Sequence, residues 1–205
     1  MSKLVLTAGE QSQSDNSPFN ARGGKSGELI ISACHGKYAE ASMRGNLFMA
    51  HAIVTAPVIY TTEAGTGGPL LWNGSATHKA SLLAVGFGVT VVTTVAAALG
   101  ITGGDNQTAA PTSTTAIDSS TNLLIGGAVS KCTAYRVGTT VENKFFLPFA
   151  HVHTGALTVD TTGVQWVDLG GLITVLPNCF ASVAASATAS TTVASICLIW
   201  EELPI

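Results

Sequence analysis

Beyond residue 28, short runs of apolar and β-branched residues alternate with turn signals along the chain. The breaks between the runs contain Gly, Pro and Asn, as at Gly170-Gly171 and Pro177-Asn178. About eight strands with this spacing predict an all-β sandwich, and a jelly roll is the topology that we expect. The runs cover residues 29–33, 52–60, 82–98, 123–129, 133–137, 141–149, 157–159, 164–169, 172–176 and 181–200.

Two of these runs, residues 82–98 and 181–194, contain Ala-rich stretches and have a helical alternative. Ser and Thr are interspersed with Ala in the second run, and both compete for backbone hydrogen bonds, so a helix there would be weak. We therefore expect strands with a face of small residues. A short helical turn is expected only within residues 40–51, where Met43, Leu47 and His51 recur every four positions.

Residues 81–101 carry no charge and are long enough to cross a membrane as a helix. Gly86, Gly88 and Thr90 interrupt this segment, and its Val and Thr content is typical of strands buried on both sides. The segment therefore predicts a pair of buried strands, and we expect no membrane partner.

The chain is predicted to consist of an arm and a body. Residues 1–27 form a flexible or docking amino-terminal arm, since residues 10–27 are rich in Ser, Asn and Gly and cannot build a core. Residues 28–205 form a single β-sandwich domain. The arm also contains Phe19, Arg22 and Lys25, which we expect to anchor it to a neighbouring subunit or to a larger shell. Within the body, the polar loop 102–122 is long enough to suggest a role at an interface.

Charge is scarce and unevenly placed. Charged residues make up 10% of the chain and hydrophobic residues 46%, and the net charge is -3. This composition excludes a charged coiled coil or overall disorder, and the net charge gives no attraction for nucleic acid. All nine Lys and Arg lie between Lys3 and Lys144, so the last 61 residues hold four acids and no base. Such a bare surface predicts a homo-oligomer, and we expect a trimer, embedded in a larger assembly.

The four cysteines are expected to be free, buried thiols. The amino terminus lacks the apolar stretch and cleavage site of a secretory signal, which predicts a chain that is made and kept in a cytosol. The cysteine spacings also differ from those of zinc sites. The residues concerned are Cys34, Cys132, Cys179 and Cys197.

Candidate chemistry is sparse. His151 and His153 would point to one face of a strand and have the spacing of a metal pair, although a pair of ordinary histidines beside an aromatic patch is the reading we favour. Asp160 and Asp168 would be a possible acid–base pair, but solvent-facing turn positions fit them better. Because nucleophile elbows and phosphate-binding loops are absent, we expect neither an enzyme nor a cofactor.

The carboxyl terminus offers a candidate interface. Trp200 ends a long apolar run and is followed at once by Glu201 and Glu202. An aromatic anchor beside acids is typical of an interface rim, so these three residues are predicted to contact a partner. The alternative is a core tryptophan on the last strand.

Several stretches carry a more specific pattern. The first is residues 36–48, GKYAEASMRGNLF, and the others are SLLAVG at 81–86, DLGG at 168–171, LPN at 176–178 and WEELP at 200–204. In these stretches the body resembles a group of small virion structural proteins of tailed bacteriophages. The group usually has a Gly where Asn178-Cys179 stands, so the turn there is expected to differ.

The resemblance implies a virion component synthesised in the host cytoplasm, and a capsid decoration (cement) protein fits the size. Its partners would then be further copies of the chain and the major capsid protein or other virion proteins, without specific nucleic acid. One alternative is a tail or major shell component. Another is a carbohydrate-binding module, which exposed aromatic residues in a groove would favour.

Overall fold

Alternating burial along the last strand shows how this sequence forms a sandwich. In β13, Val193–Pro204, every second residue from Ala194 to Glu202 is buried and the residues between them are partly exposed. The period of two places one face of the strand in a core, as expected for a sheet covered on one side. The computed structural model describes residues 38–55, 58–59, 66–67, 69–91, 97–105, 115–116, 121–139, 143–152, 165–186 and 193–205.

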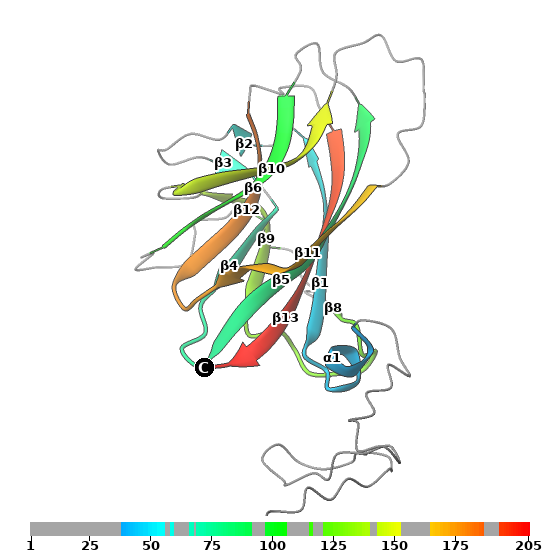
Figure 1. The fold of residues 1–205 in the computed structure, drawn as a ribbon, viewed down its shortest axis with the longest axis vertical. Helices are drawn as coiled ribbons and strands as arrows, with labels where there is room; N and C mark the ends of the chain where they lie inside the picture. Colours follow the sequence, from blue (N-terminus) through cyan, green and yellow to red (C-terminus); the bar gives the residue numbers. More distant parts are fainter. Residues whose placement is uncertain are drawn as a thin grey trace, which may run out of the picture. The chain divides into compact units, whose positions relative to one another are not determined.

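The described residues form thirteen strands and one short helix, which Figure 1 shows in order along the chain. They are α1 Ala39–Met43, β1 Leu47–Thr55, β2 Val58–Ile59, β3 Thr66–Gly67, β4 Leu70–Asn73, β5 His78–Val91, β6 Ala97–Gly104, β7 Thr115–Ala116, β8 Thr121–Asn122, β9 Thr133–Thr139, β10 Phe145–Val152, β11 Gln165–Val175, β12 Cys179–Ala185 and β13.

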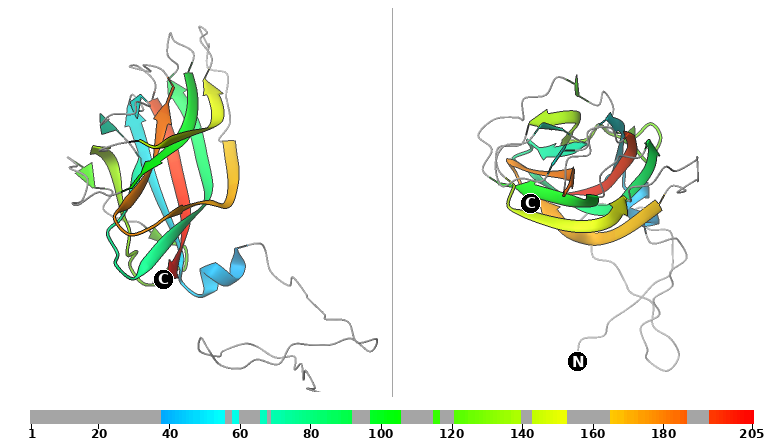
Figure 2. Two further views of the ribbon diagram at one scale, coloured as in Figure 1. Left: turned by 60° about the vertical axis from the view of Figure 1, so that its left-hand side comes forward. Right: turned by 90° about the horizontal axis from the view of Figure 1, so that it is seen from above.

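Two antiparallel sheets face each other, as two views in Figure 2 show. The first has the strand order β11-β5-β13-β1-β8, and the second contains the order β10-β6-β12-β4-β9-β3. Eight strands carry the fold: β1, β4, β5, β6, β10, β11, β12 and β13. Their distribution over the two sheets is that of two Greek keys, so the predicted all-β sandwich and jelly-roll topology are confirmed. The remaining strands are additions at the margins.

Side chains from both sheets fill the space between them. Val54, Ile196 and Leu198 come from the first sheet, and Leu99 and Val183 come from the second. Each is at most 2% exposed. Burying one such side chain contributes about 1.5–3 kcal/mol, so the alternating pattern is the main source of stability.

Several sequence expectations need revision. The helical turn expected within residues 40–51 ends at Met43, and His51 lies in β1 instead. The apolar run 123–129 is a loop rather than a strand. Residues 81–101 do contain two strands, β5 and β6, but the two lie in opposite sheets. The runs 29–33 and 157–159, and the predicted boundary between arm and body, lie outside the described residues.

The Gly170-Gly171 pair is a bulge inside β11 rather than a turn between two strands. The register against β5 shifts between Asp168 and Ile173. The φ angles of Gly170 and Gly171 are 56° and 82°, in the left-handed region that glycine adopts without strain. On β10, the register is likewise irregular between Pro148 and Ala150. Both strands are sheet edges, and each irregularity interrupts the row of backbone groups that another strand would need.

The turn at Asn178 shows how this sequence manages without the expected Gly. Asn178 has a φ of 59°, and asparagine tolerates the left-handed region better than other residues with a side chain. Its backbone N–H donates to the Asn73 carbonyl at 2.7 Å, which ties this turn to the end of β4.

Candidate functional site

Six residues are predicted to form an interface, three in the amino-terminal arm and three near the carboxyl terminus. Phe19, Arg22 and Lys25 lie outside the described residues. Trp200 and Glu202 lie on the buried face of β13, whereas Glu201 lies on its opposite, partly exposed face.

Trp200 is a core residue, so its predicted role at an interface rim is wrong. Its side chain is 0% exposed and stacks on Phe48 of β1, with ring centroids 6.1 Å apart. The reason is that every second residue of a strand faces the same side of the sheet. Trp200 is separated from Leu198 by one residue and therefore shares its inward face. A buried indole also requires a hydrogen-bond acceptor, and Trp200 Nε1 donates to Glu202 Oε1 at 3.1 Å.

Glu202 is also misassigned by the interface prediction, because its carboxylate is turned inward and organises a neighbouring loop. The residue is 4% exposed. Besides the indole, it accepts hydrogen bonds from Ser130 Oγ at 2.5 Å and from the backbone N–H groups of Lys131 and Cys132. A buried charge is tolerated when donors surround it in this way. Glu202 thus fastens the chain segment just before β9 to the end of β13.

The two weak metal-ligand candidates, His151 and His153, have no described side chains. The backbone of His151 belongs to β10 and pairs with Ala98, but its side chain and all of His153 lie outside the described residues. In the part of the chain that the structure describes, no group of three or more His, Cys, Asp or Glu gathers. Asp160 is outside that part too, and Asp168 is exposed on β11, where its carboxylate accepts from the Gly170 N–H.

One polar contact was not anticipated from the sequence. His51 Nε2 and Ser195 Oγ are 2.7 Å apart on the outer face of the first sheet, where His51 lies opposite Cys197 in the strand pairing. The two residues are 144 positions apart, so only the pairing of β1 with β13 brings them together. The contact joins two adjacent strands, β1 and β13, so we assign it a structural role.

The most distinctive surface feature is apolar. Ten large hydrophobic residues of the described chain are exposed, and seven of them fall into two groups. We call Met43, Leu124, Ile125 and Val129 the loop patch, and Trp166, Leu172 and Leu176 the strand patch. Exposed apolar groups of this kind mark interaction sites more often than single exposed residues do.

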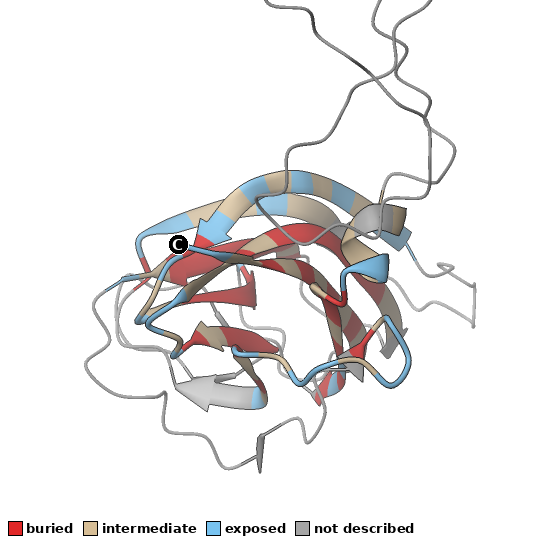
Figure 3. Cartoon of the chain, turned by 90° about the horizontal axis from the view of Figure 1, so that it is seen from below, coloured by how far each residue is buried: buried red, intermediate tan, exposed pale blue. Residues whose placement is uncertain are grey.

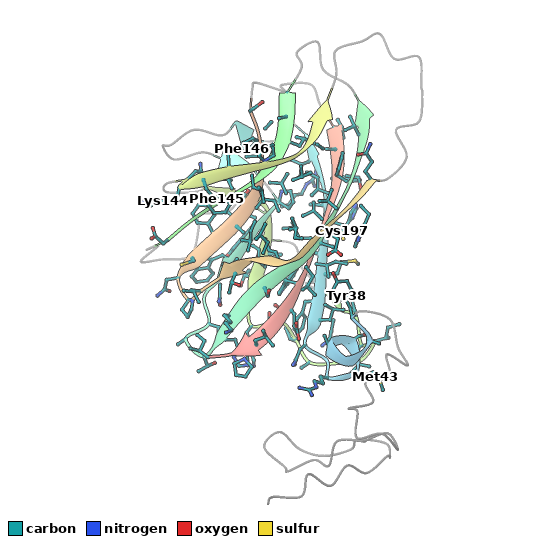
Figure 4. The ribbon with its side chains drawn as sticks, in the orientation of Figure 1. Tyr38, Met43, Lys144, Phe145, Phe146 and Cys197 are labelled. Carbon is teal, nitrogen blue, oxygen red and sulfur yellow. The ribbon has the colours of Figure 1, made fainter. Side chains whose placement is uncertain are left out.

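The loop patch is held in place by buried polar contacts. Asn122 Nδ2 donates to the carbonyls of Gly45 and Ala128, and its Oδ1 accepts from the Leu124 N–H. These bonds join the loop after β8 to the segment that follows α1, and Figure 4 labels Met43 on that helix. On the far side of the loop, Glu202 holds residues 130–132. The exposed fractions of Ile125 and Val129 are nevertheless 97% and 80%.

The strand patch follows the outward side of β11. Trp166 is 54% exposed, and its ring lies so close to Gly86 that a Cβ there would be 2.7 Å from it. Leu172 is 73% exposed just after the glycine bulge, and Leu176 is 52% exposed just after the strand. Figure 3 shows the alternation of exposed and intermediate positions along this outermost strand.

Comparison of the chain with protein families, characterised proteins and solved structures gives no match. The resemblance to phage virion proteins therefore remains a prediction from the sequence motifs. Within the described residues, no helix has the length and apolar character that crossing a membrane requires.

The three described cysteines form no disulfide with one another, in agreement with the prediction of thiols. Cys132 is buried, whereas Cys179 and Cys197 are only partly buried, and Cys34 lies outside the described residues. Burial raises the pKa of the Cys132 thiol far above its ordinary value, and the negative charge and hydrogen bond of Glu202 raise it further. Burial also raises the pKa of the Cys197 thiol. The Cys132 thiol is therefore protonated at neutral pH, which makes it a poor nucleophile.

The Glu202 contacts make a first prediction. Replacing Glu202 by Ala leaves the Trp200 indole and two backbone N–H groups without their acceptor, so the free energy of unfolding should fall by at least about 2 kcal/mol. Urea unfolding followed by circular dichroism measures the loss. Glu201→Ala, one residue away on the outward face, is the matched control and should change stability by less than about 0.5 kcal/mol. Equal losses in the two variants would contradict the assigned role.

A second prediction concerns the thiols. At about pH 8, near the ordinary cysteine pKa, native Cys132 should resist alkylation by iodoacetamide, because its raised pKa keeps the thiol protonated. Mass spectrometry of the digested protein measures the modification, and labelling in urea supplies the control in which Cys132 reacts fully. The thermal midpoint should also be the same with and without a reductant. Modification of native Cys132 at the rate of a small thiol would refute the prediction.

Proposed function

We propose that the chain is a structural protein of a bacteriophage virion, and specifically a capsid decoration protein that stabilises the shell through contacts between subunits. The observation that carries the proposal is the pair of exposed apolar patches on a jelly-roll body with very few charges. A monomer would leave these patches in water, whereas an assembly covers them.

The chemistry of the described residues agrees with a structural role. The buried polar side chains of Glu202, Asn122 and Asn73 are engaged in hydrogen bonds that fasten loops to strands. Asn73, which is 0% exposed, donates to the carbonyls of His78 and Val175 and so joins both sides of the β4–β5 turn to the end of β11. Such groups maintain the shape of the body, and we assign no reaction to it.

Jelly rolls serve both viral capsids and lectins, so the fold alone does not decide between assembly and sugar binding. Sugar-binding sandwiches present several aromatic rings on one face. Among the described residues, the large exposed aromatics are Trp166 on β11 and Phe145 on β10, which belong to different sheets. Trp166 has apolar neighbours in the strand patch instead, which favours a protein partner.

The direct test of this proposal is the composition of particles. Virions of the phage whose genome encodes this chain should contain the chain in a fixed ratio to the major capsid protein. Quantitative mass spectrometry of the purified virions measures this ratio. Imaging of the particles at side-chain resolution would then distinguish a decoration protein on the outer shell from a tail or major shell component. Purified virions that lack the chain would reject all three structural roles.

The predicted arm provides a separate test. Deleting residues 2–26 should leave the circular dichroism of the body unchanged, because a segment this rich in Ser, Asn and Gly cannot build a core of its own. Occupancy on particles should fall sharply, since Phe19, Arg22 and Lys25 would no longer anchor the arm. Particles stripped of the protein and incubated with each form give the comparison. Equal decoration by the truncated and intact proteins would show that the arm does not bridge to the shell.

A further inference from the structure

The two apolar patches differ in the charges beside them. The loop patch is flanked in sequence by the cations Arg44 and Lys131, both exposed. The strand patch includes the exposed Asp168 between Trp166 and Leu172, and the chain contains no Lys or Arg after Lys144. The loop patch therefore has two basic neighbours in sequence, whereas the strand patch has Asp168 between Trp166 and Leu172, with Lys79 of the adjacent strand β5 near its Leu176 end.

The patches also lie at opposite ends of one sheet. The first sheet begins with β11, which carries the strand patch, and ends with β8, from which the loop patch continues. The three strands between them, β5, β13 and β1, separate the two surfaces. One subunit therefore cannot cover its own strand patch with its own loop patch.

We propose that the loop patch of one copy packs against the strand patch of the next copy. This contact joins two different surfaces, so it is heterologous, and repeating it around an axis closes a ring. This contact specifies the structural role proposed above. It rests on that role in one respect, namely that the chain works as a multimer.

Side chains rather than added strands would form this contact. The bulge at Gly170-Gly171 interrupts β11 as a template for pairing, but it also presents Leu172 at the sheet edge. On the opposite surface, Asn122 and Glu202 fix the loop before any partner arrives, so little conformational entropy is lost on docking. The anchors of the two patches are Ile125, which is 97% exposed, and the large indole of Trp166, which is 54% exposed. The charges beside these two patches, Lys131 and Asp168, are of opposite sign.

The test uses the full chain with one acidic substitution in each patch. Wild-type protein at micromolar concentration should have one discrete mass that is a whole multiple of the 20.8 kDa chain mass, as measured by light scattering coupled to size exclusion. Ile125→Asp and Leu172→Asp should each reduce the mass to that of one chain, with unchanged circular dichroism. Ile205→Asp is the matched control, because Ile205 is 71% exposed and belongs to neither patch, and it should keep the wild-type mass.

Mixing the two patch variants gives the decisive result. The Ile125→Asp chain retains a strand patch and the Leu172→Asp chain retains a loop patch, so one intact contact forms and the mixture should contain dimers. The opposing aspartates prevent the ring from closing. A mixture that stays monomeric, a monomeric wild type, or an Ile205→Asp protein that also dissociates would each overturn the proposal.

Particle binding measured in parallel separates this proposal from the proposed function. A multimer that behaves as described but is absent from virions would refute the virion role and leave the contact standing. A wild-type monomer that decorates particles would refute the contact and leave the virion role standing.

Discussion

The inward face of β13 is the constraint on which the rest of the structure depends. This strand lies between β5 and β1, and its buried positions supply Ile196, Leu198 and Trp200 to the core. At its end, Glu202 accepts hydrogen bonds from the segment that leads into β9, a strand of the second sheet. One strand therefore centres the first sheet, fills the core, and links the first sheet to the second. The apolar loop on the surface owes its fixed position in part to the same carboxylate.

Much of the fold could be predicted from local patterns, because sandwich strands alternate with a period that is visible in the sequence. The elements that could not be predicted depend on pairing between distant segments. Apolarity alone did not distinguish the loop 123–129 from a strand, since its position is determined by Asn122 and its contacts with Gly45 and Ala128. Two neighbouring glycines signal a turn as readily as a bulge, and only the register against β5 decides between them.

The candidate site was harder to predict than the fold. A tryptophan followed by two acids resembles a rim element, yet the parity of β13 turns Trp200 and Glu202 inward and leaves Glu201 outside. Extending the alternation from Leu198 would have placed them correctly. The exposed patches, in contrast, had no sequence signal of their own: Trp166 and Leu172 read as ordinary strand residues, and their exposure follows from the position of β11 at a sheet edge.

The irregular edges of β10 and β11 affect how the protein can be produced. At high concentration, a sandwich with long, regular edges would be prone to join other copies edge to edge into fibrils. Pro148 and the two glycines of β11 interrupt both edges on that side of the molecule. The sandwich can therefore expose apolar side chains on its surface while withholding the backbone template on which amyloid growth depends.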